Sequence, residues 1–244
     1  MERGAGGGAS VPRETLAAQV ERFGLDQAVV TKLAALLTAL AAEPDPHTSV
    51  SDPVAAADVH LADSLVALEA PGVRAAQAIA DIGAGAGFPG LALAAALPSA
   101  RVDLIESQRR KCAVIERLAL AAGLDRARAV PARAEDWGAG EGASAYDLVT
   151  ARAVASLAVL VEYAAPLLTL DGTFIAWKGT PDPEEEDAGN RAASEVGLEP
   201  GVRLAVTPYP ASTDRHLYLY RKSSPTPERF PRRPGMAAKR PLAR

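Results

Sequence analysis

A glycine-rich segment at residues 81–90 carries the strongest chemical signal in the chain. It runs from Asp81 through glycines at 83, 85, 87 and 90, after a short apolar run and before a helical pattern. Glycines adopt positive φ angles and let a ligand approach the backbone closely. The dinucleotide fingerprint needs a third glycine five residues after the first, and Phe88 stands there. Because Asp81 would also disfavour a phosphate, the segment favours a cationic ligand such as S-adenosylmethionine.

Two more acidic positions extend this segment into a predicted site. Glu106 ends the next apolar run, 23 residues after Gly83, where a carboxylate can accept hydrogen bonds from both ribose hydroxyls. Residues 133–136 (Arg-Ala-Glu-Asp) follow the third apolar run, where an acid and backbone groups could contact an adenine edge. The three positions together predict an acid-lined S-adenosylmethionine site.

The elements that must position these residues follow from the hydropathy pattern. Apolar runs predict strands over 78–82, 102–105, 127–131, 147–151, 172–178, 201–206 and 215–221. Helical patterns separate most of them, over 88–97, 108–122, 156–168 and 184–196. Alternating strands and helices imply a mostly parallel sheet with helices on both faces, whose carboxyl ends carry the ligand. Prolines at 208 and 210 favour a tight connection and an antiparallel last strand.

The chain divides into four predicted segments. They are a disordered leader (1–12), an N-terminal helical extension (13–75, with helices over 13–42 and 54–70), a core (76–222) and a basic tail without regular structure (223–244). Residues 221–244 have a net charge of +7 and the remaining chain −11. A basic tail on an acidic body indicates an anionic partner, with a merely solvated tail as the alternative.

Composition excludes several classes of protein. The 244 residues are 48% hydrophobic with a net charge of −4, which suits a folded core. The single cysteine, Cys112, excludes a disulfide framework and is expected in the core, and three scattered histidines predict no metal site. No apolar run is long enough to span a membrane, and no signal peptide is evident. We therefore predict a cytoplasmic protein without a membrane partner; a monomer is expected, although the sequence does not fix the oligomeric state.

The glycine-rich segment, the acidic positions after it and several further stretches of the chain resemble class I S-adenosylmethionine-dependent methyltransferases. More closely, they resemble the bacterial 16S ribosomal RNA guanine-N7 methyltransferase G family, also called glucose-inhibited division protein B. The matching stretches are 81–90, 104–107, 110–111, 133–135, 150–155 and 177–179, with 48–50, 52–53 and 60–64 upstream and 214–217, 230–235 and 239–242 downstream. They cover roughly residues 45–242. Two departures concern the N-terminal signature: Pro46 or His47 stands where an asparagine is usual, and Val59 precedes His60 where an arginine is common.

The resemblance implies a fold, an activity and a set of site residues. The implied fold is Rossmann-like, with a seven-stranded, mostly parallel sheet and an antiparallel last strand. The implied activity is methylation of guanine N7 in the 530 loop of 16S ribosomal RNA, with that RNA or the small ribosomal subunit as partner. The predicted cofactor contacts include the turn and Glu106 identified above; they are Gly83, Gly85, Phe88, Glu106, Ala134, Glu135 and Arg152. The predicted RNA contacts are Lys178, Arg215, Arg232, Arg233, Lys239 and Arg240.

The acceptor atom can be narrowed from the residues themselves. Amine methylation usually needs Asp/Asn-Pro-Pro-Tyr after the fourth strand, where this chain has Ala151-Arg152-Ala153. Guanine N7 is a lone-pair nucleophile with no proton to remove, so alignment is sufficient and no general base is obligatory. Arg152 and Lys178 are expected to position cofactor, guanine or RNA, with a structural salt bridge as the alternative for Arg152. His60 is expected to cap or bridge the N-terminal helices.

Three other functions remain open at this point. A methyltransferase with a small-molecule acceptor would not need the basic tail. A non-catalytic ribosome-binding module with a retained cofactor fold would bind RNA and transfer nothing. A nicotinamide dehydrogenase is opposed by Phe88 at the third glycine position of the fingerprint.

Overall fold

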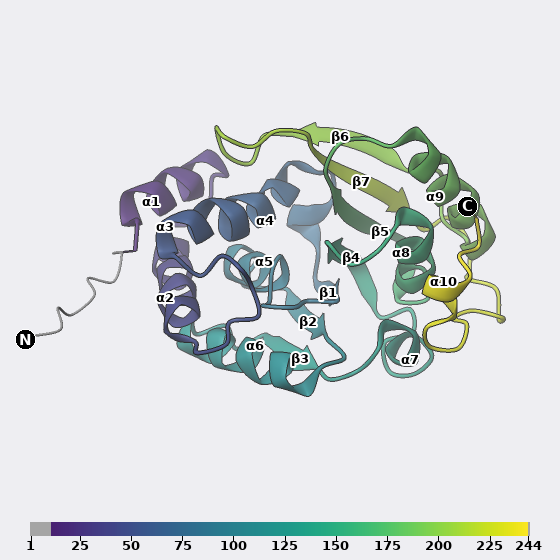
Figure 1. Cartoon of the computed structure of the whole chain (residues 1–244), viewed down its shortest axis with the longest axis horizontal. Coiled ribbons are helices and arrows are strands. Elements are labelled where there is room, and N and C mark those ends of the chain that lie inside the picture. The colour runs from purple at the N-terminus through teal and green to yellow at the C-terminus, as the bar shows by residue number, and fades with distance from the viewer. Residues whose placement is uncertain (1–10, 244) are drawn as a thin grey trace, which may run out of the picture.

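A central sheet with helices on both faces organises the molecule, as the computed structural model in Figure 1 shows. The structure describes residues 11–243. The predicted leader at 1–12 therefore lies almost entirely outside the described residues. Within residues 11–243, no helix combines the length and the apolar character that crossing a membrane requires.

The sheet has seven strands in the order β3-β2-β1-β4-β5-β7-β6. Their bounds are Ala78–Ile82 (β1), Arg101–Ile105 (β2), Ala127–Val130 (β3), Tyr146–Arg152 (β4), Leu168–Lys178 (β5), Val202–Val206 (β6) and Arg215–Arg221 (β7). The strands from β3 to β5 pair in parallel, and β7 runs antiparallel to both β5 and β6. This confirms the predicted sheet and its antiparallel last strand. The strand order reverses between β1 and β4, which is where open sheets of this kind bind ligands.

Helices cover the two faces of the sheet in two separate apolar clusters. On one face lie α5 (Gly90–Ala96) and α6 (Arg109–Ala121), together with the N-terminal helices. On the other lie α8 (Leu157–Ala164) and α9 (Pro183–Val196), with the short α7 (Ala134–Gly138) beside them. Cys112 of α6 is buried and unpaired, in agreement with its expected place in the core.

The N-terminal extension packs into the first of these clusters. Its elements are α1 (Arg13–Arg22), α2 (Ala28–Ala42), α3 (Pro53–Ala56), a π-helical turn η1 (Ala57–Ala62), α4 (Asp63–Leu65) and the 3₁₀ turns η2 (Val66–Glu69) and η3 (Val73–Ala75). The expected helix over 54–70 is thus broken into several short pieces. The Asp52 carboxylate caps it, accepting hydrogen bonds from the amides of Val54 and Ala55 at 3.1 and 3.0 Å. Widened π-turns of this kind often accompany functional sites.

The C-terminal segment contradicts the expectation that it lacks regular structure. It forms α10 (Met236–Lys239), and Phe230 and Ala237 are buried. In Figure 1 the segment is yellow and lies beside α8, at the opposite end of the molecule from α1. The expectation was wrong because it rested on proline and arginine content, whereas isolated apolar side chains decide where the segment packs.

Candidate functional site

The glycine-rich turn leaves β1 at its carboxyl end and is held by its neighbour β2. The amides of Gly83 and Ala84 both donate to the carbonyl of Ile105, at 2.8 and 3.2 Å. Gly83, Gly85 and Gly87 have φ angles of +65°, +58° and +99°. Residues other than glycine rarely adopt such φ angles, so this path of the backbone requires the alternating glycines.

Asp81 lies beneath the turn and does not line the ligand cavity. It is fully buried, and its carboxylate accepts hydrogen bonds from the Gly90 amide at 3.0 Å and the Thr150 hydroxyl at 2.8 Å. Burial raises the pKa of Asp81 to about 6. The sequence interpretation placed this acid beside the ligand, and that was wrong. Asp81 instead ties β1, β4 and the start of α5 together, which fixes the turn from behind.

A cavity of about 300 Å³ opens in front of the turn, at the carboxyl ends of β1, β2 and β3. Of the predicted cofactor contacts, Gly83, Glu106, Ala134 and Glu135 line it. Gly85, Phe88 and Arg152 are not among its lining residues, so their roles stay predictions. The other lining residues are Ile82, Ile105, Ser107, Gln108, Lys111, Ala132, Arg133, Ala153, Val154 and Tyr163.

Both carboxylates of the cavity are buried and anchored by backbone amides. Glu106 Oε2 accepts from the Gly85 amide at 3.2 Å, and Oε1 accepts from the Gln108 amide at 2.8 Å. Glu135 Oε1 accepts from the amide of Gly235, one hundred residues further along the chain, at 2.7 Å. A carboxylate oxygen accepts more than one hydrogen bond, so both groups keep acceptor capacity for a ligand. Two anchored acids, apolar walls and an approachable glycine turn fit the sulfonium, ribose and adenine of S-adenosylmethionine.

A buried charge cluster joins the N-terminal extension to the sheet beside the turn. Asp63 of α4 accepts a hydrogen bond from Arg152 at 2.8 Å and two from Arg215, at 2.7 and 2.9 Å. The His60 ring stacks on Phe88, with centroids 4.9 Å apart and an interplanar angle of 6°. Arg152 also donates to the Val59 carbonyl at 3.0 Å. The structural alternative stated for Arg152, a salt bridge, is therefore what the structure contains.

His60 bridges the extension as expected. Its Nε2 lies 2.9 Å from the Val50 carbonyl oxygen and 3.1 Å from the Thr48 hydroxyl, and its Nδ1 faces Arg152. Burial, and secondarily the Arg152 charge, lower the pKa of His60 to about 4. The ring is therefore neutral at pH 7. It links the extension to the turn through Phe88.

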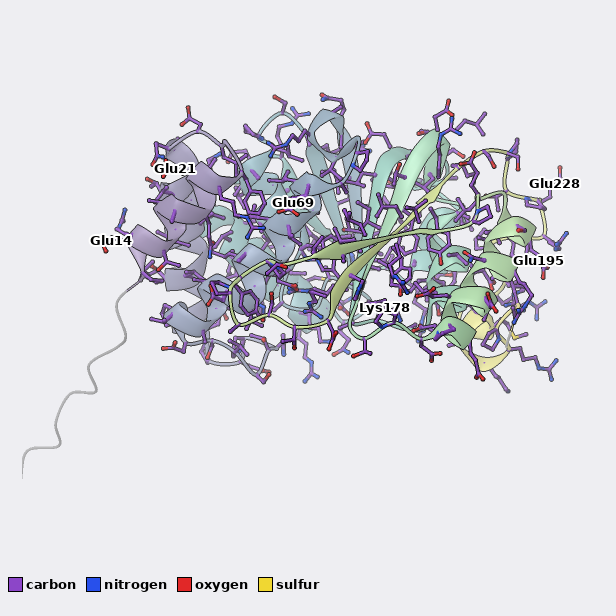
Figure 2. The ribbon with its side chains drawn as sticks, turned by 90° about the horizontal axis from the view of Figure 1, so that it is seen from above. Glu14, Glu21, Glu69, Lys178, Glu195 and Glu228 are labelled. Atoms are coloured by element: carbon purple, nitrogen blue, oxygen red, sulfur yellow. The ribbon has the colours of Figure 1, made fainter. Side chains whose placement is uncertain are left out.

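The predicted RNA contacts fall into two groups. Lys178 pairs with Glu185 at 2.6 Å, Arg215 with Asp63, and Arg232 with Glu162 at 2.7 and 2.5 Å, so these three cations are not free. Figure 2 shows Lys178 in the middle of the molecule, between α1 with Glu14 and Glu21 and the end that carries Glu195 and Glu228. Arg233, Lys239 and Arg240 are exposed, and within residues 11–243 none has a carboxylate partner. The number of basic residues in the sequence could not show which of these cations form ion pairs, because their carboxylate partners are set by the fold.

Sequence reasoning missed several residues around the cavity. Lys111 and Arg133 line it, and Arg109 and Arg110 are exposed at the start of α6 beside Lys111. No carboxylate in the described part of the chain pairs with any of these four cations. Their signal was present, since 110–111 and 133–135 belong to the matching motifs, but it lay outside the basic tail. Asp63 also lies in a matching motif, at 60–64, but its contacts appear only in the folded chain, and Tyr163 gave no signal at all.

The fold and the cavity define the class of protein. A seven-stranded sheet with this order, a glycine turn at the strand-order reversal and an acid ending β2 make it a class I S-adenosylmethionine-dependent methyltransferase. A solved methyltransferase described as the S-adenosylmethionine-dependent SibL has this fold, with a TM-score of 0.56 and 17% identity over 86% of this chain and 70% of that one. A predicted O-methyltransferase from Agrobacterium tumefaciens gives a TM-score of 0.52 and 25% identity over 67% of this chain and 80% of that one.

Sequence comparison narrows the class to a family. The family model described as rRNA small subunit methyltransferase G matches residues 33–209. The protein named ribosomal RNA small subunit methyltransferase G from Deinococcus radiodurans is 38% identical, covering 94% of this chain and 92% of its own length. Its namesake from Pelotomaculum thermopropionicum is 41% identical, covering 75% and 77%. The chain belongs to the rRNA small subunit methyltransferase G family, which confirms the predicted family, enzyme class and cofactor.

Proposed function

We propose that this protein transfers a methyl group from S-adenosylmethionine to N7 of a guanine in the 530 loop of 16S ribosomal RNA. The cavity at the carboxyl ends of β1 to β3 carries this proposal, because it places Glu106 and Glu135 beside Gly83. Family membership supports a small-subunit ribosomal RNA as the substrate class. Since bacterial ribosomal RNA is assembled in the cytoplasm, the protein is proposed to act there.

Specific residues of the cavity would hold the cofactor, which supplies an activated methyl group on a sulfonium centre. Glu106 is oriented by two backbone amides and would accept the ribose hydroxyls. Ala134 and Glu135 would contact the adenine, and Gly83 lets the ligand approach the backbone closely. The carboxylates also favour the positive charge that the guanine acquires as the methyl group arrives.

The side chains of the extension beside the turn favour an acceptor that needs no deprotonation. His60 and Asp63 are the titratable side chains of the extension that reach the turn and its neighbouring strand ends, and both are fully engaged. Burial and Arg152 keep the pKa of His60 near 4, and its Nε2 faces the Val50 carbonyl and the Thr48 hydroxyl. Neither group is placed to remove a proton. Guanine N7 needs no such group, so positioning in line with the methyl group is sufficient.

Phosphate contacts would come from two cations of the cavity wall, Lys111 and Arg133, and from the two exposed arginines that precede Lys111 in α6. Arg109, Arg110, Lys111 and Arg133 lie at the starts of α6 and α7, where a bound RNA strand would pass the methyl donor. Arg233, Lys239 and Arg240 extend this set on the C-terminal segment. Phosphate contacts of this kind position the RNA and make its affinity depend on salt.

Methyl-labelled S-adenosylmethionine tests the proposal directly. The purified protein is incubated with undermodified small subunits and with free 16S RNA, and the labelled nucleoside is mapped. We expect label in 7-methylguanosine at one site in the 530 loop. The Glu106→Ala variant should lose labelling, whereas Glu141→Ala, which removes an exposed acid away from the cavity, should keep it.

The other results each contradict part of the proposal. Label in a different nucleoside would overturn the acceptor atom and keep the enzyme class. Labelling of a small molecule but neither RNA substrate would favour the small-molecule methyltransferase. Cofactor binding without transfer to any acceptor would favour the non-catalytic ribosome-binding module.

A further inference from the structure

The C-terminal segment is anchored to the core at several points, and two of them lie beside the cofactor cavity. We call residues 223–243 the C-terminal strap. Arg232 Nε and Nη2 donate to both oxygens of Glu162 in α8, at 2.7 and 2.5 Å, and this carboxylate is buried. Three residues later, the Gly235 amide donates to Glu135 in α7 at 2.7 Å. A paired-oxygen arginine contact fixes orientation as well as distance, so the strap has a defined place on the core.

The strap is also closed on itself around these anchors. Arg232 Nη2 donates to the Arg240 carbonyl at 2.9 Å, which joins the residues on the two sides of α10. Phe230 and Ala237 are buried on either side of the anchors. Gly235 has a φ of +79° at the start of α10, which turns its amide toward Glu135. The geometry of one arginine thus sets the position of the Gly235 amide.

Both anchors reach the wall of the cofactor cavity from outside. Glu135 lines the cavity, and the strap occupies one of its carboxylate oxygens while the other remains for a ligand. Glu162 precedes Tyr163, which also lines the cavity. α7 is a single short helix of five residues, so little of its own structure restrains the Glu135 side chain. The anchors therefore connect the strap to two residues that line the cavity: Glu135 directly, and Tyr163 through its neighbour in sequence, Glu162.

We propose that the strap positions Glu135 for cofactor binding, with Arg232 and Gly235 as its positioning residues. The proposal rests on the proposed assignment of the cavity as the S-adenosylmethionine site. It gives Arg232 a different role from that predicted by its charge: it acts on the cofactor through Glu162 and the Gly235 amide. The exposed Arg233 and Lys239 on the same strap remain for RNA phosphate, so the strap has a cofactor face and an RNA face.

Binding of S-adenosylhomocysteine to the full-length chain, measured by calorimetry without RNA, separates the two faces. Arg232→Ala is expected to weaken binding by up to about tenfold, the effect of losing one well-formed hydrogen bond at a site. Arg232→Lys keeps the charge without the paired geometry and should recover only part of the affinity. Arg229→Ala is the matched control, because Arg229 lies on the same strap, is exposed and, among the residues that the structure describes, interacts only with Glu195 and the Phe230 ring. It should bind like the unmodified chain.

A second variant keeps the test valid if Arg232→Ala fails to fold. Gly235→Ala adds a methyl group into open space but strains a backbone with φ of +79°, so it disturbs the amide and not the packing. It should also weaken S-adenosylhomocysteine binding, while the core still unfolds in a single cooperative transition despite the local strain. Arg233→Ala should lower affinity for an RNA fragment of the 530 loop and leave S-adenosylhomocysteine binding unchanged.

The Glu135→Ala variant distinguishes this inference from the assignment of the cavity. If Glu135→Ala weakens binding while the folded Arg232 and Gly235 variants bind normally, the strap does not position the acid and the inference is overturned. If Glu135→Ala and Glu106→Ala both bind normally, the assignment of the cavity fails instead. Weakened binding in the strap variants, with a normal Arg229→Ala, supports both.

Discussion

The N-terminal extension and the C-terminal strap are both docked by a buried carboxylate and arginine, but in opposite senses. The extension supplies the acid, Asp63, which is fully buried and meets two arginines of the core, Arg152 and Arg215, with 12% and 31% exposed side chains. The strap supplies the cation, Arg232, whose side chain is 24% exposed and pairs with the buried carboxylate of Glu162 in the core. Both carboxylates are buried, so the difference lies in the number of partners: Asp63 meets two arginines, whereas Glu162 meets Arg232 alone among the described residues.

The apolar surroundings deepen this difference. The extension adds Leu16, Leu33, Leu37 and Leu61 to the same cluster that covers one face of the sheet. The strap adds only Phe230 to the buried members of the opposite cluster, with Leu242 and Ala243 partly buried against it. We conclude that the extension is part of the fold, whereas the strap is an attachment that adjusts a site. Four measurements test this contrast.

The largest effect is expected at the two ion pairs of Asp63. Asp63→Ala leaves two guanidinium groups without their buried carboxylate, which costs about 3–5 kcal/mol. The free energy of unfolding, measured by urea denaturation, should fall by that amount. Asp45→Ala is the matched control, since Asp45 is exposed and among residues 11–243 pairs only with His47, and it should change stability by less than about 0.5 kcal/mol. A loss at Asp63 no larger than at Asp45 would show that the extension is not held by this pair.

Acid should weaken the docking of the extension through His60. The pKa of His60 is near 4 in the folded chain and about 6.5 when unfolded, so its contribution is full above pH 6.5 and is lost as pH falls toward 4. The loss is at most about 3 kcal/mol. The raised pKa of Asp81 acts in the opposite sense, with stability lost as pH rises from about 4 to 6.

A difference experiment isolates the histidine from Asp81. The stability gap between the unmodified chain and His60→Gln is measured between pH 7 and pH 4, because Asp81 is common to both and cancels. The gap should shrink as pH falls. A gap that stays constant would mean that His60 protonates without disturbing the extension.

A smaller loss is expected at the strap. Arg232→Ala removes one ion pair, whereas Asp63→Ala removes two, so the lost stability should be about 1–2 kcal/mol, less than at Asp63. The same urea titration measures it. A loss equal to that of Asp63→Ala would erase the contrast, because the strap would then be as integral to the fold as the extension.

The smallest change in stability is expected at the outer face of the strap. Arg233→Ala combined with Lys239→Ala should leave unfolding within about 0.5 kcal/mol, because both side chains are exposed. RNA binding should weaken, and the slope of log affinity against log salt should fall by about one for each phosphate that the variant no longer binds. An unchanged slope would remove these two residues from the RNA surface.

The parts of the molecule that the sequence predicted well are those encoded locally. The strands, the glycine turn and Glu106 each depend on neighbours within a few residues, such as the apolar run before Gly83. Periodicity and glycine placement report such short-range requirements directly.

The parts that escaped prediction depend on contacts between distant residues. Arg152 and Arg215 meet Asp63 across 89 and 152 residues, and Arg232 meets Glu162 across 70. A charge count treats each arginine as free, although a buried acid elsewhere in the chain decides its role. Asp81 shows the same limit in reverse, since its motif position suggested a ligand contact and its burial excludes one.

The long reach of Asp63 also bears on the order in which the molecule assembles. Its two arginines belong to β4 and β7, and β7 finds its place only beside β5. Contacts that close such long loops form late, because chain entropy must be lost before they stabilise anything. We therefore expect the extension, although it leaves the ribosome first during synthesis, to be the last large element to settle. Helix α2 can already pack on α5 and α6 by then, but Asp63 has only one of its two arginines until Arg215 is synthesised, so the extension should gain its full stability only once β7 has formed.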